Sequence, residues 1–416
     1  MACPPAQGVH GWFPHESVSP WIHSLLGPPT GTSKRLVSFA SAAVRKCLAA
    51  SRHTKFECTI ATIPLEWNGT VEERVAAHMD QISSAYSSTH SASTDELPSR
   101  ANLEDFRPNV HASRTKSVDE KSALPWRKEA IEAADLVYFV GHSQGSIVTT
   151  ILVASLVDQG ILDPARQNVC ILALAGISHG PFPGIASIVQ YLQTPASAQL
   201  FELNKPESAL SQCYSTSLAT VLERGCRLVA VGSWMDEVVP LHSSLLCGYR
   251  HPHIHRVLFV EDAELTGGSF ILHLAIWCIR LLNRGLSDHG LIYFLSPLAA
   301  GSLVGTVSRG HTILYEDLCT FRTGFEFLVK EVGCTETNKL IEVPLPSTTA
   351  VRPDPFGLTW AFARVVSDPA VRSDAAIWAY LIETLDRFDK WNPPAGPLRD
   401  AKAQLAHGIR RASFRK

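Results

Sequence analysis

The sequence predicts an α/β fold built around a doubly wound, mostly parallel sheet. Apolar runs of strand length alternate with longer helical runs through most of the 416 residues. Apolar residues make up 45% of the chain, which is enough for one large core or two modest ones. The formal net charge of −2 gives no reason to expect a nucleic-acid partner.

The individual elements follow from this alternation. The candidate strands are short apolar runs: Glu57 to Pro64, Leu136 to Val140, Val169 to Ala175, Arg227 to Gly232 and Arg256 to Val260. The candidate helices are longer runs without an internal proline: Thr32 to Ser51, Val71 to Ser84, Ser146 to Gln159 and Phe270 to Asn283.

Two stretches interrupt the alternation. Residues 83–124 are rich in Ser, Thr, Asn, Asp and Arg, so we expect a flexible insertion or a lid there. Residues 344–355 are rich in proline, and two amphipathic helical patterns follow between Trp360 and Phe388. We therefore expect a main domain over residues 1–335 and a helical C-terminal extension over residues 336–416 that packs on it.

The strand ending at Val140 runs directly into Gly141-His142-Ser143-Gln144-Gly145, and an uninterrupted helical run follows. This is the G-x-S-x-G pattern in the strand-to-helix context that a nucleophile elbow requires. A Cβ at either glycine is expected to collide with the backbone of so sharp a turn, and the serine is held in a strained conformation that exposes its Oγ. The pattern predicts Ser143 as a nucleophile, with an ordinary glycine-lined turn as the alternative.

A serine is a poor nucleophile at neutral pH, so a histidine base and an orienting acid are needed further along the chain. Asp236 follows the buried strand Arg227 to Gly232, where a carboxylate faces the crevice at the carboxyl end of the sheet. It is our candidate acid. The alternatives are that Asp236 caps a helix beginning near Pro240, and that neighbouring Glu237 takes the role.

His311 is the candidate base because it follows a glycine and precedes a helix. It lies far beyond Asp236, so residues 265–307 must form a helical excursion that returns to the sheet. We expect His311 beside Ser143 and Asp236. The rivals are His251, His253, His255, His273 and His289, of which His273 lies on an apolar helix and is expected to be buried away from the site.

The oxyanion of the reaction needs two backbone N–H donors. Gln144, the residue after the nucleophile, supplies one, and Trp12 in the turn from Val9 to Pro14 is the candidate for the other, unless this is an ordinary surface turn. Neighbouring side chains are expected to shape the substrate pocket; they are His10, Phe13, His142 and Trp234.

The remaining composition bears on cofactors and location. The ten cysteines show no metal-ligand spacing, and acyl transfer on a serine needs no cofactor, so we expect neither a metal nor an organic cofactor. The N-terminus shows no charged segment followed by an apolar run, and the longest apolar stretch, Phe270 to Leu282, is too short to span a bilayer. We expect a cytoplasmic protein without an integral membrane segment.

Together these motifs resemble those of a fungal family of α/β-hydrolase-domain proteins. The matching segments are residues 9–14, 29–33, 141–145, 175–181, 232–240 and 310–316, and the likeness extends through Ser287 to Leu291 and the C-terminal helices. The resemblance implies an α/β-hydrolase fold with Ser143, Asp236 and His311 as its triad, and it says nothing about the substrate. Family members carry an apolar strand before the turn that here contains His10 and Gly11. In this chain the segment before that turn, residues 1–8, is short and contains two prolines, so the first strands of the sheet could be lacking.

Three functions are compatible with these residues. The first is a serine hydrolase that cleaves a small-molecule ester, thioester or activated amide through an acyl-enzyme. The second is an acyltransferase or cyclase of fungal metabolism that uses the same site but passes the acyl group to an alcohol or amine. The third is a catalytically silent α/β-hydrolase scaffold.

Overall fold

The computed structural model describes residues 32–50, 60–83, 127–185, 195–261, 269–299, 309–329, 339–346, 356–393 and 396–411. The predicted site residues His10, Trp12 and Phe13 lie outside these ranges, as does nearly all of the predicted insertion over residues 83–124. The fold is described from the remaining elements.

In the described parts of the chain, four parallel strands form the central sheet, in the order β1-β2-β3-β5. They are β1 (Leu136–His142), β2 (Asn168–Leu174), β3 (Arg227–Ser233) and β5 (Ile254–Phe259). The register pairs Val140 with Leu172 and Leu172 with Val229, so the carboxyl ends of the strands meet at one edge. A separate antiparallel pair joins β4 (Tyr249–Arg250) and β6 (Ile341–Glu342).

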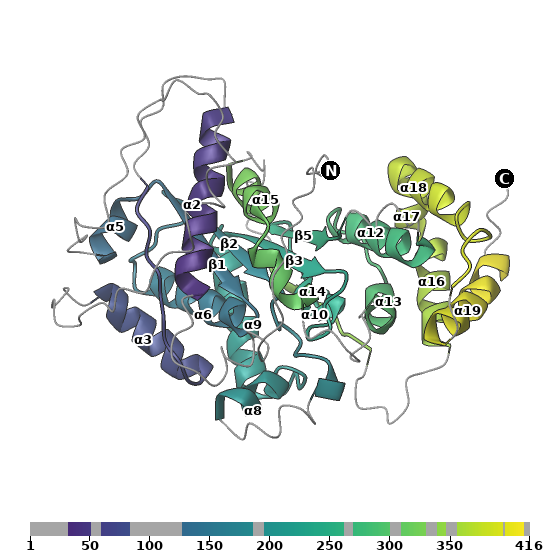
Figure 1. Cartoon of the computed structure of the whole chain (residues 1–416), viewed down its shortest axis with the longest axis horizontal. Coiled ribbons are helices and arrows are strands. Elements are labelled where there is room, and N and C mark those ends of the chain that lie inside the picture. The colour runs from purple at the N-terminus through teal and green to yellow at the C-terminus, as the bar shows by residue number, and fades with distance from the viewer. Residues whose placement is uncertain are drawn as a thin grey trace, which may run out of the picture.

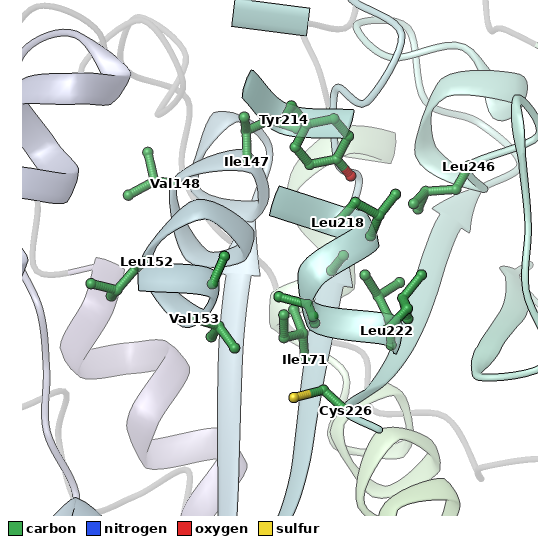
Figure 2. Packing of buried hydrophobic residues seen from close by; sticks show 14 of the residues in the cluster. Ile147, Val148, Leu152, Val153, Ile171, Tyr214, Leu218, Leu222, Cys226 and Leu246 are labelled. Carbon is green, nitrogen blue, oxygen red and sulfur yellow. The ribbon is translucent and has the colours of Figure 1, made fainter. Parts of the chain in front are cut away.

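Alternate side chains of the strands point into two different cores, as the two-residue period of a strand requires. Ile171 and Ala230 pack under α3 (Val71–Ser83), α6 (Gln144–Asp158) and α9 (Ala209–Glu223), and Figure 2 shows part of this core. Leu172 and Val229 pack on the opposite face, under α2 (Thr32–Ala50) and α15 (Leu318–Val329). The helices therefore cover both faces of the sheet (Figure 1).

A second group of helices lies beyond β5, on the right in Figure 1. They are α12 (Phe270–Leu282), α13 (Leu291–Ala299), α16 (Gly357–Ser367), α17 (Pro369–Ser373), α18 (Ala375–Leu385) and α19 (Pro397–Arg411). These helices share one apolar core, and the fully buried Trp277 lies within it. No helix in the described parts of the chain has both the length and the apolar character needed to cross a membrane.

The shorter elements lie mostly in the loops that join the strands. They are α5 (Arg127–Ala133), η1 (Pro183–Ile185), α8 (Pro195–Glu202), α10 (Leu241–Ser244), α14 (Arg309–Thr312) and η3 (Ile313–Tyr315). Of these, α10 follows the loop that carries Asp236, and α14 itself contains His311, which was expected on a loop.

One predicted strand is wrong over its described part. Within Glu57 to Pro64, Ile60 forms a single bridge and residues 61–64 are irregular. Ile63 still packs against the core, and two residues later the carbonyl of Leu65 accepts a hydrogen bond from Ser33 Oγ on α2 at 2.6 Å. The apolar pattern therefore reports burial against neighbouring helices rather than pairing in the sheet.

Candidate active site

Ser143 stands at the turn between β1 and α6. Its backbone has φ 55° and ψ −125°, a left-handed conformation that is strained for any residue except glycine. The turn is tied to the sheet by a 2.8 Å hydrogen bond from Ser143 N–H to the carbonyl of Leu174. Serine at the start of a helix usually accepts a capping hydrogen bond, but the side chain of Ser143 makes none. Its hydroxyl therefore remains available for chemistry.

The two glycines of the turn differ in their roles. A Cβ at Gly141 would lie 2.6 Å from the carbonyl oxygen of Gly145, so only glycine fits there. A Cβ at Gly145 would meet only the guanidinium of Arg74, at an ordinary 3.7 Å. The expectation that both glycines avoid a backbone collision is thus correct for Gly141 and wrong for Gly145, because the second flank of the turn faces a side chain.

Asp236 and His311 meet at the carboxyl end of the sheet. The Nδ1 of His311 lies 2.9 Å from Oδ2 of Asp236, and both side chains are almost completely buried. The other oxygen, Oδ1, accepts hydrogen bonds from the N–H groups of Val238 and Val239 at 2.8 and 2.9 Å. Asp236 therefore holds its own turn, as the capping alternative supposed, and orients the imidazole as well.

His142, next to the serine, supports the backbone of His311. Its Nε2 lies 2.9 Å from the carbonyl oxygen of His311, and the two rings are 4.6 Å apart between centroids. Burial lowers the pKa of His142 to about 3, so the ring is neutral and donates its Nε2 proton to that carbonyl. The edge of the Tyr315 ring packs against the same imidazole at 4.9 Å between centroids. His142 thus links the nucleophile turn to α14, the short helix that contains His311.

The rival histidines have other surroundings. His255 stacks on Phe327, and His251 packs against His253. His289 Nε2 lies 2.9 Å from a carboxylate oxygen of Asp368. His273 is half-buried rather than fully buried, with Nδ1 3.3 Å from the hydroxyl of Tyr380 on α18.

A cavity of about 1370 Å³ opens beside the serine. Ser143, His142 and His311 line it together, so the predicted nucleophile and base face the same space. Apolar side chains supply much of the remaining wall, among them Leu36, Val37 and Ala40 of α2, and Val140 of β1. Trp234 was expected to shape the substrate pocket, but it does not line the described part of this cavity. It packs instead with Leu241 and Leu245 in the apolar core of the helices beyond β5.

One of the two predicted oxyanion donors can be placed. Gln144 is the first residue of α6, so its N–H has no carbonyl one turn earlier in the helix to bond. Its side chain points elsewhere, with Oε1 accepting a 3.0 Å hydrogen bond from Arg74. Within the described ranges, no three His, Cys, Asp or Glu side chains gather as a metal ion would require.

The parallel sheet, the elbow and the meeting of Asp236 with His311 agree with a comparison of the sequence with known families. Residues 4–91 and 119–368 match the YMC0/YMC35 alpha/beta hydrolase domain. The chain belongs to this family. The residues between the two matched segments, 92–118, fall inside the predicted insertion. No curated protein and no solved structure matches the chain. Membership in this α/β-hydrolase family confirms the predicted fold class and supports a hydrolase-like domain acting on a small molecule.

Proposed function

We propose that this protein is a serine hydrolase that cleaves an ester, thioester or activated amide, with Ser143, Asp236 and His311 as its triad. The observation that carries the proposal is the buried 2.9 Å contact between Asp236 and His311 at the cavity that Ser143 also lines. A cytoplasmic location and the absence of a nucleic-acid partner stay predictions.

The proposed reaction divides the work among these three side chains. The Oγ of Ser143 attacks the substrate carbonyl while Nε2 of His311 takes its proton. The Asp236 carboxylate keeps the other proton of the ring on Nδ1, and it stabilises the imidazolium that forms. The ring then returns the proton to the leaving group, and water releases the acyl group from Ser143 by the same steps.

The negative charge of the tetrahedral intermediate needs donors that are already in place. In this proposal the N–H of Gln144 is one of them, because it is free at the start of α6 and follows the nucleophile directly. Trp12 remains the proposed second donor, with His10 and Phe13 as proposed pocket residues. The apolar wall from α2 and β1 suits the hydrocarbon part of an acyl group.

The experiment is the hydrolysis of 4-nitrophenyl butyrate and hexanoate by wild-type protein and by three variants. We expect Ser143→Ala to abolish turnover. We expect Asp236→Asn to lower kcat by roughly 10⁴-fold, because its amide NH₂ would face Nδ1 and shift the ring proton to Nε2. The amide carbonyl can still accept from Val238 and Val239, so the turn should stay folded.

Glu237→Gln is the matched control, because it changes the neighbouring acid. It should retain nearly full activity. Full activity in Asp236→Asn, together with loss of activity in Glu237→Gln, would show that Glu237 is the orienting acid. Full activity in Ser143→Ala would remove the serine from the mechanism. A folded wild-type protein without activity on either ester would favour the scaffold.

A further inference from the structure

A half-buried arginine on α3 lies directly beside the nucleophile turn. Arg74 Nη1 donates a 3.0 Å hydrogen bond to Oε1 of Gln144. Its Nη2 lies 3.7 Å from the point that a Cβ on Gly145 would occupy. Arg74 also lines the cavity that holds Ser143. The guanidinium is therefore next to the two residues that follow the nucleophile.

The charge of Arg74 has no acidic partner within the described parts of the chain. None of the ion pairs among these residues includes it, and its buried Nε has no hydrogen-bond acceptor there. Burial lowers its pKa to about 10, which still leaves the group charged at neutral pH. A guanidinium carries five N–H donors, so most of them remain available. Withdrawing part of a guanidinium from water without an ion-pair partner among the described residues is costly, and a bound anion would offset that cost.

The acids nearest in the chain have other contacts. The carboxylate of Glu72 accepts a hydrogen bond from Gln199, and that of Glu73 accepts one from the N–H of Thr70 at the start of α3. Glu66 lies in the cavity wall, but its backbone carbonyl is bonded to Gln81, two turns along α3 from Arg74. One Glu66 carboxylate oxygen is buried without a hydrogen-bond partner among the described residues, and no ion pair there joins Glu66 to Arg74.

His78 adds a second polar group to the same wall. It follows Arg74 by one helical turn, is 4% exposed, and lines the same cavity. Its Nδ1 is buried and has no hydrogen-bond partner in the described structure. Burial and the charge of Arg74 lower the pKa of His78 to about 4, against the opposing effect of a hydrogen bond to the Gln81 side chain, so the ring is neutral at pH 7.

We propose that Arg74, with His78 beside it, binds a carboxylate or phosphate group of the substrate that Ser143 attacks. This inference rests on the proposed function for its site of attack, and it narrows the substrate class. The substrate is an amphiphilic acyl compound whose anionic group lies near the scissile carbonyl and whose hydrocarbon part lies along α2 and β1. The planar guanidinium suits both anions, because each can accept two parallel N–H donors.

The kinetic test compares two esters of the same chain length, the mono-4-nitrophenyl ester of adipic acid and neutral 4-nitrophenyl hexanoate. In Arg74→Gln we expect kcat/KM for the anionic ester to fall by about tenfold or more, because a charge-assisted hydrogen bond is lost. The value for the neutral ester should change by less than about twofold. Arg74→Lys keeps the charge and should fall between wild type and Arg74→Gln. Arg399→Gln on α19, an exposed arginine, is the control that should change neither ester.

An equal loss for both esters would overturn the proposal, because Arg74 would then act only by holding Gln144 and the turn. No effect on either ester would also overturn the proposal, and would show in addition that the turn does not depend on Arg74. Far-ultraviolet circular dichroism of each variant separates these outcomes from unfolding, and Arg74→Lys serves if Arg74→Gln does not fold.

A binding test does not depend on turnover. Octanoate, octyl phosphate and neutral octanamide are titrated by calorimetry into the Ser143→Ala protein. At least one anion should bind about tenfold tighter than octanamide, and this preference should vanish in the Ser143→Ala, Arg74→Gln double variant. The two anions show which group the site prefers.

Anion binding that persists in the double variant, or equal binding of octanamide, would exclude the anion site. Anion binding that depends on Arg74, found in a wild-type protein that hydrolyses neither ester, would instead contradict the proposed hydrolase while leaving the anion site in place.

Discussion

At Gly310 the chain passes so close to the loop after β3 that no side chain fits. A Cβ there would overlap the carbonyl of Met235 and lie 2.9 Å from the backbone nitrogen of Asp236. Gly310→Ala should therefore push α14, and His311 with it, away from Asp236. Because an orienting hydrogen bond fails when its atoms move by about 1 Å, we expect activity to fall by at least about 10²-fold.

Ester hydrolysis and thermal unfolding of Gly310→Ala check this expectation. Gly184→Ala is the matched control, because a Cβ at Gly184 meets no atom within 4 Å and the residue has no positive φ. It should retain activity and stability. Wild-type activity in Gly310→Ala would mean that the two loops need not approach so closely.

The three proposed triad residues could be found from the sequence because they share one property. Ser143, Asp236 and His311 each stand in a local pattern, directly after a strand or after a glycine, so the fold's topology brings them to one edge. Arg74 has no such pattern. It is one more charged residue on an amphipathic helix, which usually faces solvent, and only the packing of α3 against α6 turns it toward the cavity.

At the scale of elements, the sequence predicted the four strands of the parallel sheet and the helices α2, α3, α6 and α12 to within a few residues. These are strongly apolar or clearly periodic runs. Helix α9 was missed because Ser, Thr and Gln interrupt its apolar face, although Ser208 caps its start by accepting a hydrogen bond from Ser211 N–H. The predicted strand beginning at Glu57 was wrong over residues 61–64, because apolar alternation does not reveal whether a neighbouring strand is present.

Trp277 on α12 joins the second group of helices. It is fully buried, and its indole Nε1 donates a 3.0 Å hydrogen bond to the carbonyl of Ile377 on α18. Trp277→Ala should lower the free energy of unfolding by about 3–5 kcal/mol, because it leaves a large cavity and removes this buried hydrogen bond.

Urea unfolding of Trp277→Ala tests this prediction. Trp360→Ala on α16 is the control, since Trp360 is 53% exposed, and it should change stability by no more than about 0.5 kcal/mol. Equal effects of the two substitutions would show that the helices beyond β5 do not depend on this contact.

The whole molecule buries several histidines in neutral form. Burial lowers the pKa of His78 and His179 to about 4, and that of His142 and His242 to about 3. Each has an ordinary pKa near 6.5 when unfolded, so below that pH the unfolded chain takes up protons that the folded chain does not. The contribution of these histidines to the free energy of unfolding should thus be fully present above pH 6.5 and decline as the pH falls toward 4.

The urea midpoint measured at pH 7.5 and pH 5 checks this expectation, and it should be clearly lower at pH 5. Burial raises the pKa of the Asp288 carboxyl, so this group alone should make the folded protein more stable as the pH falls. The four histidines together should outweigh it. A midpoint that stays constant or rises between these two pH values would show that the histidines are not buried as described.

The proposed function depends above all on Ser143 being an activated nucleophile. Its most direct test is labelling with a fluorophosphonate, which reacts covalently with activated serines, followed by mass spectrometry of the digested protein. We expect a single adduct on Ser143, much weaker labelling of Asp236→Asn, and none of Ser143→Ala. A correctly folded wild-type protein that stays unlabelled, or one labelled at another residue, would contradict it.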